Sequence, residues 1–428
     1  MTPPRRSGPL VGVIADDATG GTDVAVAFRR HGLTVWLGFR TPEDHDPRTA
    51  DAAVADVVVL ALKIRTIAAD RAVAAATTAA DWLHQLGAQR LYYKYCSTFD
   101  STATGNIGPV LDALMLQSRT ERVVHTPSTP EHGRTQYLGH LFVHHVLLAE
   151  SPMRDHPLTP MRDSQIVRLL AAQTSADVHL IPHPVISAGR PELQNRLGQL
   201  DRGHILVDAI TDADLASVGA AISAEPLIAG AAGLAGGLAR VLAPAVPPQE
   251  DTVVDGPTER AAILAGSCSA RTLEEIAVFQ RAGLPAHRLD IQRDPDPQAM
   301  ADRALAWFDT LEPGRVPLVY SSLPPAELSA IHRSIGAEAA AQVFEEAIGA
   351  IAKGLANRGV DSFVVAGGET SGAVIEALGC AGGTVGAEAA PGVPWLSAAD
   401  GKRLLLKSGN FGDVGLLANI GRHGDEAP

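Results

Sequence analysis

Residues able to bind a small polar molecule crowd into the segment Lys94–Thr102, between an apolar run and a helical pattern. The segment offers an ammonium group, four hydroxyls and a carboxylate, supplied by Lys94, Ser97, Thr98, Asp100, Ser101 and Thr102. A substrate rich in hydroxyl and carboxylate groups needs such partners, so Lys94, Ser97 and Asp100 are candidate substrate ligands. The alternative interpretation is an ordinary loop whose Ser, Thr and Asp side chains cap the next helix.

Two adjacent carboxylates, Asp16 and Asp17, follow the first apolar run, Leu10–Ala15. A carboxylate beside a substrate hydroxyl can act as a general base, worth on the order of 10²–10⁴-fold in rate. It can also help to position Mg²⁺. We expect Asp17 to be the catalytic base, with Asp16 as the alternative. The competing interpretation is an Asx-turn with a helix cap.

The residues after this pair predict where the next helix begins. Gly20 and Gly21 are expected to let the backbone turn tightly. Thr22 or Asp23 is then expected to cap a helix that runs to His31.

Three Gly- and Ser-rich turns in the second half of the chain each follow an apolar strand pattern. They are Ala265–Ser269, Val364–Gly372 with a helix from Thr370 or Ser371, and Lys407–Gly412, where a lysine precedes a Gly/Asn loop. Backbone N–H groups at helix N-termini bind phosphate, and glycine permits close approach. The turns predict a nucleotide site, although no P-loop and no clear dinucleotide-binding motif is present. The candidate nucleotide ligands are Ser267, Ser269, Gly367, Gly368, Glu369, Thr370, Gly409 and Asn410.

Histidines and cysteines indicate no dominant metal site. The loose cluster of His125, His132, His140, His144 and His145 is compatible with zinc, and His140 and His144 are four residues apart. No suitably spaced Glu or Cys completes it, so ordinary core or surface histidines are favoured. The three cysteines are far apart and form no disulfide framework, which favours a reducing cytosol.

Composition narrows the class of protein. A chain of 428 residues predicts two or three domains, and 46% hydrophobic residues allow a sizeable core. The formal charge of −13 argues against nucleic acid as the main partner. The apolar stretch Pro226–Ala239 is too short to span a bilayer, and no signal peptide is convincing. We therefore expect a cytoplasmic protein without a membrane partner.

The elements that must position these residues alternate between strand and helix patterns, as in an α/β layered fold with mainly parallel sheets. The expected strands are Leu10–Ala15, Leu33–Phe39, Val57–Ile64, Leu91–Tyr95, Arg122–Thr126, Ile205–Val207, Leu227–Ile228, Ala261–Leu264, Val316–Tyr320 and Phe363–Val365. The expected helices are Thr22–His31, Ala68–Leu86, Pro109–Leu114, Gly230–Leu242, Thr272–Ala282, Ala337–Asn357 and Ser371–Leu378. Prolines and acids without periodicity predict a linker at 244–260, between domains 1–243 and 261–428.

The motifs together resemble the four-carbon acid sugar kinase family over essentially the whole chain. They are Ala15–Asp23, Lys94–Asp100 with Gly105–Pro109, Gly133–Thr135, Gly139–Val143, His156–Ser164, Gly266–Ser269, Gly367–Gly372 and Lys407–Gly412. The strings 94–109 and 156–164 are most similar to the 3-oxo-tetronate kinase branch. Departures from the family pattern occur at Ala18, Gly21 and 229–233, which puts the exact substrate in question.

The resemblance implies ATP-dependent phosphorylation of a 3-oxo four-carbon sugar acid at its 4-hydroxyl. It implies a substrate domain followed by a nucleotide domain, with ATP and Mg²⁺ as cofactors, and a homodimer is a further expectation. The acid needs a cation, for which Arg134, Lys94, Lys63 and Arg65 are candidates. The alternatives are a threonate or erythronate kinase and a non-catalytic sugar-acid binding protein.

Overall fold

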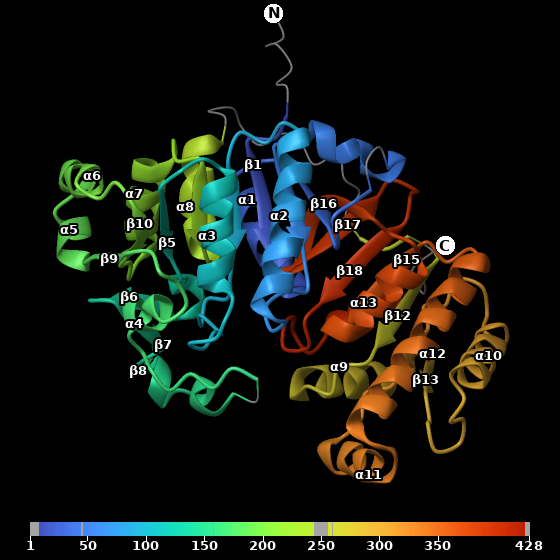
Figure 1. The fold of residues 1–428 in the computed structure, drawn as a ribbon. Coiled ribbons are helices and arrows are strands. Elements are labelled where there is room, and N and C mark those ends of the chain that lie inside the picture. The colour runs from blue at the N-terminus through green and yellow to red at the C-terminus, as the bar shows by residue number, and fades with distance from the viewer. Residues whose placement is uncertain (1–7, 44–45, 157, 244–255, 259, 424–428) are drawn as a thin grey trace, which may run out of the picture. The chain divides into compact units, whose positions relative to one another are not determined.

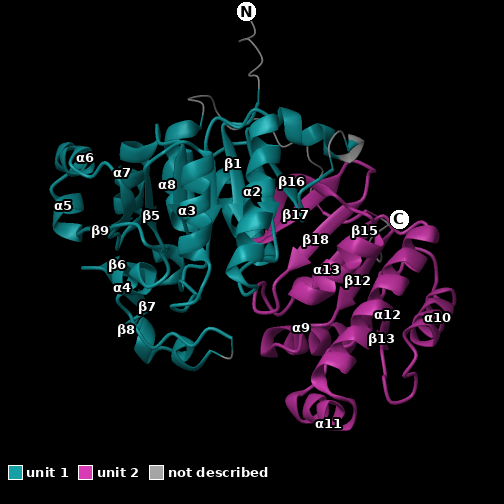
Figure 2. Cartoon of the chain, in the orientation of Figure 1, with its two compact units in different colours: residues 1–250 teal, residues 251–428 magenta. Residues whose placement is uncertain are grey.

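The computed structural model describes residues 8–43, 46–156, 158–243, 256–258 and 260–423. The chain divides into two compact units, residues 1–250 and 251–428 (Figure 2). Each unit is built on a mainly parallel sheet packed with helices (Figure 1), so the predicted α/β class is confirmed. Most of the predicted linker, residues 244–255 and 259, lies outside the described residues, and the exact domain boundaries stay predictions.

The sheet of residues 1–250 consists of parallel strands buried by their apolar sequences. In spatial order they are β2 (Val35–Gly38), β3 (Val57–Ala61), β1 (Val11–Ala15), β4 (Leu91–Lys94), β11 (Leu227–Gly230), β5 (Arg122–Thr126), β10 (Gly203–Val207) and β9 (Val178–Ile181). Runs rich in Val, Ile and Leu are typical of parallel strands that are covered on both faces. All parallel strands of one sheet end on the same side of it. In each of the two sheets we call this side, where the carboxyl ends of the strands lie, the carboxyl edge, as distinct from the outermost strands.

Helices cover both faces of this sheet. The helices are α1 (Ala18–Arg29), α2 (Ala69–Gln85), α3 (Ile107–Gln117), α4 (Ile166–Ala171), α5 (His183–Ser187), α6 (Arg190–Gly198), α7 (Asp212–Ile222) and α8 (Ala232–Leu242). Alanines of α2 and leucines of α3 share one apolar core with β1, β3 and β4. On the opposite face α8 packs against α1 and α7 (Figure 1).

The strand order of residues 1–250 reverses beside β1. The chain passes from β1 to β2 and then to β3 on one side, and resumes at β4 on the other. Ligands in open α/β sheets bind at such a topological switch point, outside the carboxyl ends of the strands. The residues that follow β1 and β4 are therefore the first place to look for a site.

A small antiparallel sheet follows β5 and was not predicted from the sequence. Its strands are β6 (Arg134–Tyr137), β7 (His140–Val143) and β8 (Val146–Leu147). The fully buried Asp208, just after β10, anchors it by accepting hydrogen bonds from the Gln136 side chain and from the backbone N–H of Leu138 and Gly139. Short 3-10 turns lie at Pro47–Val54, Pro130–His132, Leu148–Glu150 and Pro152–Asp155.

The sheet of residues 251–428 is also mainly parallel and also has a point where the strand order reverses. Its strands in spatial order are β13 (Ala286–Arg288), β14 (Leu318–Tyr320), β12 (Ala261–Ala265), β15 (Ser362–Ala366), β18 (Arg403–Lys407), β17 (Val393–Ala398) and β16 (Gly382–Ala390). The first five are parallel, and β17 and β16 are antiparallel additions. The chain goes from β12 to β13 and β14 on one side and resumes at β15 on the other, so a second switch point lies between β12 and β15.

The helices of this unit also form two layers. They are α9 (Ala270–Arg281), α10 (Pro297–Phe308), α11 (Pro325–Ile335), α12 (Ala337–Asn357), α13 (Gly368–Ala377) and α14 (Leu416–Arg422). Helices α9 and α14 share an apolar core with β12, β15 and β17, while α12 packs against α10 and α13. No helix among the described residues combines the length and apolar character needed to cross a membrane.

Every strand and helix predicted from the sequence exists, with shifts at the ends. Four helices begin earlier than predicted: α1 begins at Ala18 rather than Thr22, and α13 begins at Gly368 rather than Thr370 or Ser371. The other two, α3 and α9, each begin two residues early. In addition to the small sheet, the sequence patterns missed β9, β13, β16, β17 and several helices, whereas the apolar pattern before the third turn corresponds to β18. Of these, β9 and β13 are short strands at the ends of the strand order, where apolar periodicity is weak.

Candidate functional sites

The carboxylate pair leaves the end of β1 and starts α1. Asp17 is the N-cap of α1, and its Oδ1 accepts a hydrogen bond of 2.6 Å from the Gly20 backbone N–H. The prediction that Thr22 or Asp23 caps this helix is therefore wrong. Gly20 and Gly21 lie inside the first helical turns, and Gly21 is needed for space because a Cβ there would come within 2.5 Å of Ala61 Cβ.

Arg65, in the loop after β3, bridges both carboxylates. Its Nε and Nη2 donate to the two oxygens of Asp16, each at 2.8 Å. The same Nη2 lies 2.9 Å from Asp17 Oδ1. Asp16 is almost fully buried at 2% exposure, whereas 29% of the Asp17 side chain remains accessible. Asp17 is therefore the carboxylate that a ligand can reach.

The segment after β4 completes this charged group. Asp100 Oδ2 lies 3.8 Å from Arg65 Nη1, and Asp100 Oδ1 accepts a 2.6 Å hydrogen bond from Thr98 Oγ1. The Lys94 ammonium is buried and donates to the Tyr95 carbonyl at 2.9 Å. A Cβ on Gly20 would approach Lys94 Nζ to 3.0 Å, so Lys94 lies against the first turn of α1. We call Asp16, Asp17, Arg65, Lys94 and Asp100 the charged cluster.

The surroundings of the charged cluster shift the acidity of its members. Burial raises the pKa of Asp17 above its usual value, and the neighbouring Asp16 adds to the effect, while Arg65 and Lys94 oppose it. Burial likewise raises the pKa of the Cys96 thiol to about 11, so this cysteine stays protonated near neutral pH. A carboxylate with a raised pKa is a stronger base than an ordinary aspartate.

Backbone contacts hold the Arg65 loop in place. The Asp16 carbonyl accepts hydrogen bonds from the backbone N–H of Ile64 and of Arg65, at 2.9 and 3.1 Å. Asn106, buried just before α3, donates from its side chain to the Ile64 carbonyl at 2.6 Å. The sequence analysis assigned no role to Asn106. The one signal for this residue was its place in the family motif Gly105–Pro109.

The remaining predicted substrate ligands lie apart from these contacts. Lys63 is exposed, and Ser97 is partly buried beside Cys96. Arg134 begins β6, where its Nη1 donates to the His132 carbonyl. Its Nε is buried and has no hydrogen-bond partner among the described residues. Arg134 thus keeps a donor available for an added acceptor.

In residues 251–428, the three predicted turns converge at the carboxyl edge. Ser267 N–H and Gly367 N–H donate to the carbonyls of Ala366 and Lys407, which ties the turns to the neighbouring strands. Ser269 caps α9, and its Oγ donates to the Gly409 carbonyl at 2.7 Å. The predicted nucleotide ligands therefore lie on turns in mutual contact.

Glycine is required at several positions because the turns touch. A Cβ on Gly409 would lie 2.2 Å from Ser267 Oγ, and one on Gly266 would lie 2.2 Å from Thr370 Oγ1. Gly367 has a φ of 128°, which side chains rarely adopt, and it is the N-cap of α13. Gly368 and Glu369 are exposed, and a Cβ on Gly368 would meet no atom within 4 Å. The first turn of α13 thus presents N–H groups to open space, the arrangement that binds anions.

Lys407 and Asn410 are at different depths of the third turn. The Lys407 side chain is fully buried and lies 3.0 Å from Glu275 of α9. Asn410 is exposed at the tip of the loop. The sequence suggested that this lysine precedes a phosphate-binding loop. Its side chain is enclosed beneath the loop rather than presented at the loop surface.

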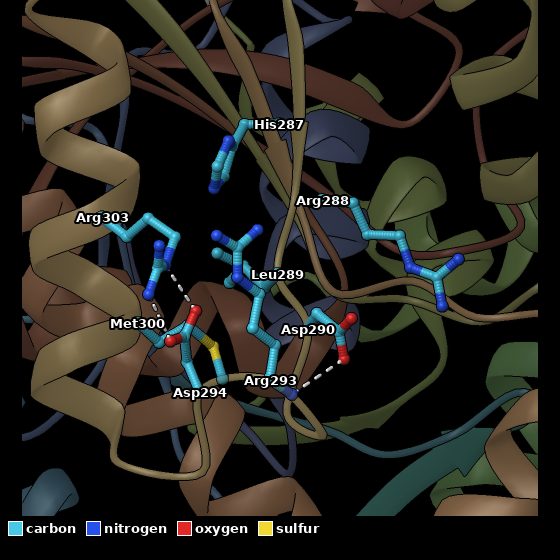
Figure 3. Close-up of a pocket in the computed structure, with 8 residues that line it drawn as sticks. All are labelled: His287, Arg288, Leu289, Asp290, Arg293, Asp294, Met300 and Arg303. Atoms are coloured by element: carbon cyan, nitrogen blue, oxygen red, sulfur yellow. Dashed lines mark hydrogen bonds and ion pairs between the residues drawn. The ribbon is translucent and has the colours of Figure 1, made fainter.

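A cavity of about 260 Å³ lies at the carboxyl end of β13 (Figure 3). It is lined by His287, Arg288, Leu289, Asp290, Arg293, Asp294, Met300 and Arg303. Arg303 holds Asp294 through hydrogen bonds of 2.7 and 2.8 Å, and Arg288 pairs with Glu327. The cavity lies at the edge strand of the sheet, outside the β12–β15 switch point.

The described histidines are not arranged as a metal centre. Among the described residues, no group of three or more His, Cys, Asp or Glu side chains is arranged to hold a metal ion. His125 is fully buried in β5, where its Nδ1 lies 3.1 Å from the Tyr95 hydroxyl. His140 lies on β7 and His144 follows it in a turn, so their spacing is not that of a helix face.

Two family models match the chain. A model described as a sugar-binding N-terminal domain matches residues 11–238. A model described as a nucleotide-binding C-terminal domain matches residues 262–417. The first contains the charged cluster, and the second contains the three converging turns.

Curated relatives and solved structures match nearly the whole chain. A 3-oxo-tetronate kinase of Burkholderia multivorans is 42% identical, over 95% of this chain and 96% of its own length. A 3-oxo-tetronate kinase of Salmonella typhimurium is 38% identical, over 94% of this chain and 96% of its own length. A solved structure from Salmonella typhimurium LT2, provisionally described as a tRNA synthase, aligns with a TM-score of 0.87 and 38% identity over 96% of this chain and 98% of its own. A Haemophilus influenzae structure aligns with a TM-score of 0.82 and 34% identity, over 97% and 99%.

Proposed function

This chain belongs to the four-carbon acid sugar kinase family, and we propose that it transfers the γ-phosphoryl group of ATP to the 4-hydroxyl of a 3-oxo-tetronate. The observation that carries the proposal is the division of chemistry between the two switch points. The charged cluster lies in the part that matches a sugar-binding domain. The three converging turns, with the exposed first turn of α13, lie in the part that matches a nucleotide-binding domain.

The three turns suit a polyphosphate. Gly409 and Gly266 leave no room for a side chain because Ser267 and Thr370 of neighbouring turns fill that space, so the turns pack closely together. Gly368 is exposed and carries no side chain, so a ligand can approach the backbone there. The start of α13 adds N–H groups and the positive end of the helix dipole. We therefore assign ATP to Ser267, Ser269, Gly367, Gly368, Glu369, Thr370, Gly409 and Asn410.

Mg²⁺ fits this arrangement as a partner of the nucleotide. Magnesium sites in kinases use one or two carboxylates together with substrate phosphates and water, rather than a cage of protein ligands. Bound Mg²⁺ would neutralise charge on the phosphates during transfer.

The charged cluster suits a hydroxy acid. Arg65 orients Asp17 through the 2.9 Å contact, and Lys94 provides a second cation against α1. Asp17 accepts the proton of the 4-hydroxyl as that oxygen attacks the γ-phosphorus, and ADP leaves with the bridging oxygen. Asp16, held by Arg65 and nearly buried, fixes the arginine. Arg134, Lys63, Ser97 and Asp100 complete the proposed set of substrate ligands.

Three alternatives to the proposed function remain: a threonate kinase, an erythronate kinase and a non-catalytic sugar-acid binding protein. Ala18, next to Asp17, differs from the usual family residue, so a threonate or erythronate kinase is the second candidate. A non-catalytic binding protein would not need an accessible carboxylate of raised pKa beside Arg65. A tRNA substrate does not suit a net charge of −13. The homodimer and the cytoplasmic location stay predictions.

The proposal is tested by a coupled ADP-release screen of the purified full chain with ATP and Mg²⁺. The acids to compare are threonate, erythronate and 3-oxo-tetronate. We expect ADP release only when the nucleotide, the metal and an acid are all present, with the 3-oxo acid turned over fastest. Turnover of none of the three acids would contradict the proposal, and preference for a non-oxidised acid would select the second candidate.

A further inference from the structure

A buried ion pair lies directly beneath the third turn. Lys407 is the last residue of β18, and Glu275 faces it from the second turn of α9. Lys407 Nζ lies 3.0 Å from Glu275 Oε2, and both side chains are fully buried. Burying two charges costs free energy that their attraction often fails to recover, so stability alone gives little reason for such a pair.

The Lys407 ammonium donates to two backbone carbonyls of the turn, that of Ser408 at 3.4 Å and that of Gly409 at 3.1 Å, and the Gly409 carbonyl collects the most donors. The Gly409 carbonyl accepts hydrogen bonds from Lys407 Nζ at 3.1 Å, Ser269 Oγ at 2.7 Å and Thr272 Oγ1 at 3.1 Å. Three donors from β18, the Ser269 cap and α9 thus converge on one oxygen. The orientation of the peptide between Gly409 and Asn410 is fixed as a result.

Fixing this carbonyl also fixes the next N–H group. In a trans peptide the C=O of one residue and the N–H of the following residue point in opposite directions, and the described chain contains no cis bond. With the Gly409 carbonyl held toward buried Lys407, the Asn410 N–H points to the opposite, exposed side. Within residues 260–423 no acceptor pairs with that N–H.

We propose that Lys407 and Glu275 are positioning residues that aim the Asn410 N–H at a phosphate of the bound nucleotide. The inference rests on the proposed nucleotide function of the turns. Lys407 acts on the ligand through the Gly409 peptide, and Glu275 balances the charge that would otherwise be buried alone. The pair keeps the loop in its binding conformation before the nucleotide arrives, which lowers the cost of binding.

The ionisation of Glu275 makes the positioning sensitive to pH. The charged groups that face it are Lys407, Arg271 on the same helix and Asp413 after the loop. Burial outweighs the attraction of Lys407 and raises the pKa of Glu275 to about 7. Protonation below that pH leaves the Lys407 ammonium without its counter-charge, so the loop should hold ATP less well.

The test compares full-length variants by calorimetry with ATP and by steady-state kinetics. Lys407→Met removes one donor to the Gly409 carbonyl, and Glu275→Gln removes the counter-charge. The double variant Lys407→Met/Glu275→Gln contains no buried charge at this place and keeps the test valid if a single variant fails to fold. Asp309→Asn is the matched control, because it neutralises an acid of a surface pair with Arg358, at 2.7 Å.

We expect Lys407→Met and the double variant to raise Kd and KM for ATP by about tenfold. KM for the sugar acid and kcat should stay within about twofold. The ratio of KM for ATP between Glu275→Gln and wild type should be largest above pH 7 and approach one at lower pH. Taking the ratio cancels the titration of ATP itself.

Two results would overturn the inference, and they are distinguishable from failure of the proposed function. Wild-type affinity for ATP in the folded double variant would show that the pair positions nothing. Equal losses in both KM values and in kcat would show a merely structural role. Failure of the wild-type protein to bind ATP would refute the nucleotide function, and this inference with it.

Discussion

The switch point between β1 and β4 and the switch point between β12 and β15 share one topology but differ in chemistry. The first gathers five ionisable side chains, with Arg65 paired to three carboxylates. The second presents mainly glycine, serine and threonine, and its one lysine is enclosed beneath the turn. In the proposed function, the first site therefore recognises its ligand with charged side chains, and the second with backbone N–H groups.

This difference shows which part of the function each level of structure determines. The strand order indicates where a ligand can bind, because ligands of open α/β sheets bind where the order reverses. The residue types after each strand determine what binds there, since fold alone does not specify function. A substitution at one of the two sites should therefore leave ligand binding at the other site unchanged.

The largest effect is expected from Asp17→Asn. Asparagine caps a helix about as well as aspartate, so the hydrogen bond from Gly20 and the start of α1 should persist. The variant loses the charge and the basicity, and kcat should fall by roughly 10²-fold or more. Kinetics at saturating substrate measure this, and ATP affinity should be unchanged.

Asp16→Asn separates the two carboxylates. Asp16 is nearly buried and accepts hydrogen bonds from two nitrogens of Arg65. Loss of its charge should loosen Arg65 and so lower kcat indirectly, through the position of Asp17. Near-normal kcat in both single variants would remove the carboxylate pair from the mechanism.

The second effect is a loss of ATP affinity in Gly368→Val. A side chain there meets open space in the protein itself, so the fold should tolerate it. If phosphate approaches this turn, Kd for ATP should rise by at least about tenfold, while binding of the sugar acid stays unchanged. Gly198→Val is the matched control, because Gly198 is also a helical glycine with no atom within 4 Å. Unchanged ATP affinity in Gly368→Val would show that the turn is only structural.

A smaller effect concerns stability and pH. The pKa of Glu275 rises from 4.5 to about 7 on folding, so between these values the folded chain binds a proton that the unfolded chain does not. This group therefore lowers wild-type stability as pH rises through that window. Glu275→Gln lacks the titration, so its Tm minus the wild-type Tm should increase by a few degrees from pH 4.5 to pH 7. A difference in Tm that does not vary with pH would contradict the burial of a titrating carboxyl.

The smallest effect is expected from Arg293→Ala in the cavity beside β13. This cavity is basic but lies outside the switch point, so the variant should change kcat and both KM values by less than about twofold. A tenfold loss of ATP affinity would extend the nucleotide site to the edge strand.

Much of the fold and the location of both edges could be predicted from the sequence. Fully apolar runs such as Val57–Ala61 mark buried parallel strands, and Gly/Ser turns after them mark the carboxyl edge. The family motifs named the residues that cluster there. Asp16 and Asp17 follow β1 and Lys94 ends β4, and all three lie against the first turn of α1, while their roles stay predictions.

The rest depends on contacts between segments distant in the sequence. The role of Arg65 as a bridge requires β1 and β3 to be neighbours, which apolar patterns do not reveal. The N-cap of α1 was misplaced because Gly20-Gly21 resembles a turn, whereas packing against Ala61 explains why the helix contains Gly21. The burial of Lys407 could not be predicted, because Glu275 lies far from it in the sequence.

The division of ligands between the two edges is tested most directly by hydrogen exchange with mass spectrometry on the full chain. ATP with Mg²⁺ and the acid that gives turnover are added separately. The account predicts that ATP slows exchange in 266–272, 367–371 and 408–412. It predicts that the acid slows exchange in 15–20, 63–66 and 94–102. Protection of 94–102 by ATP alone, or of the three turns by the acid alone, would contradict it.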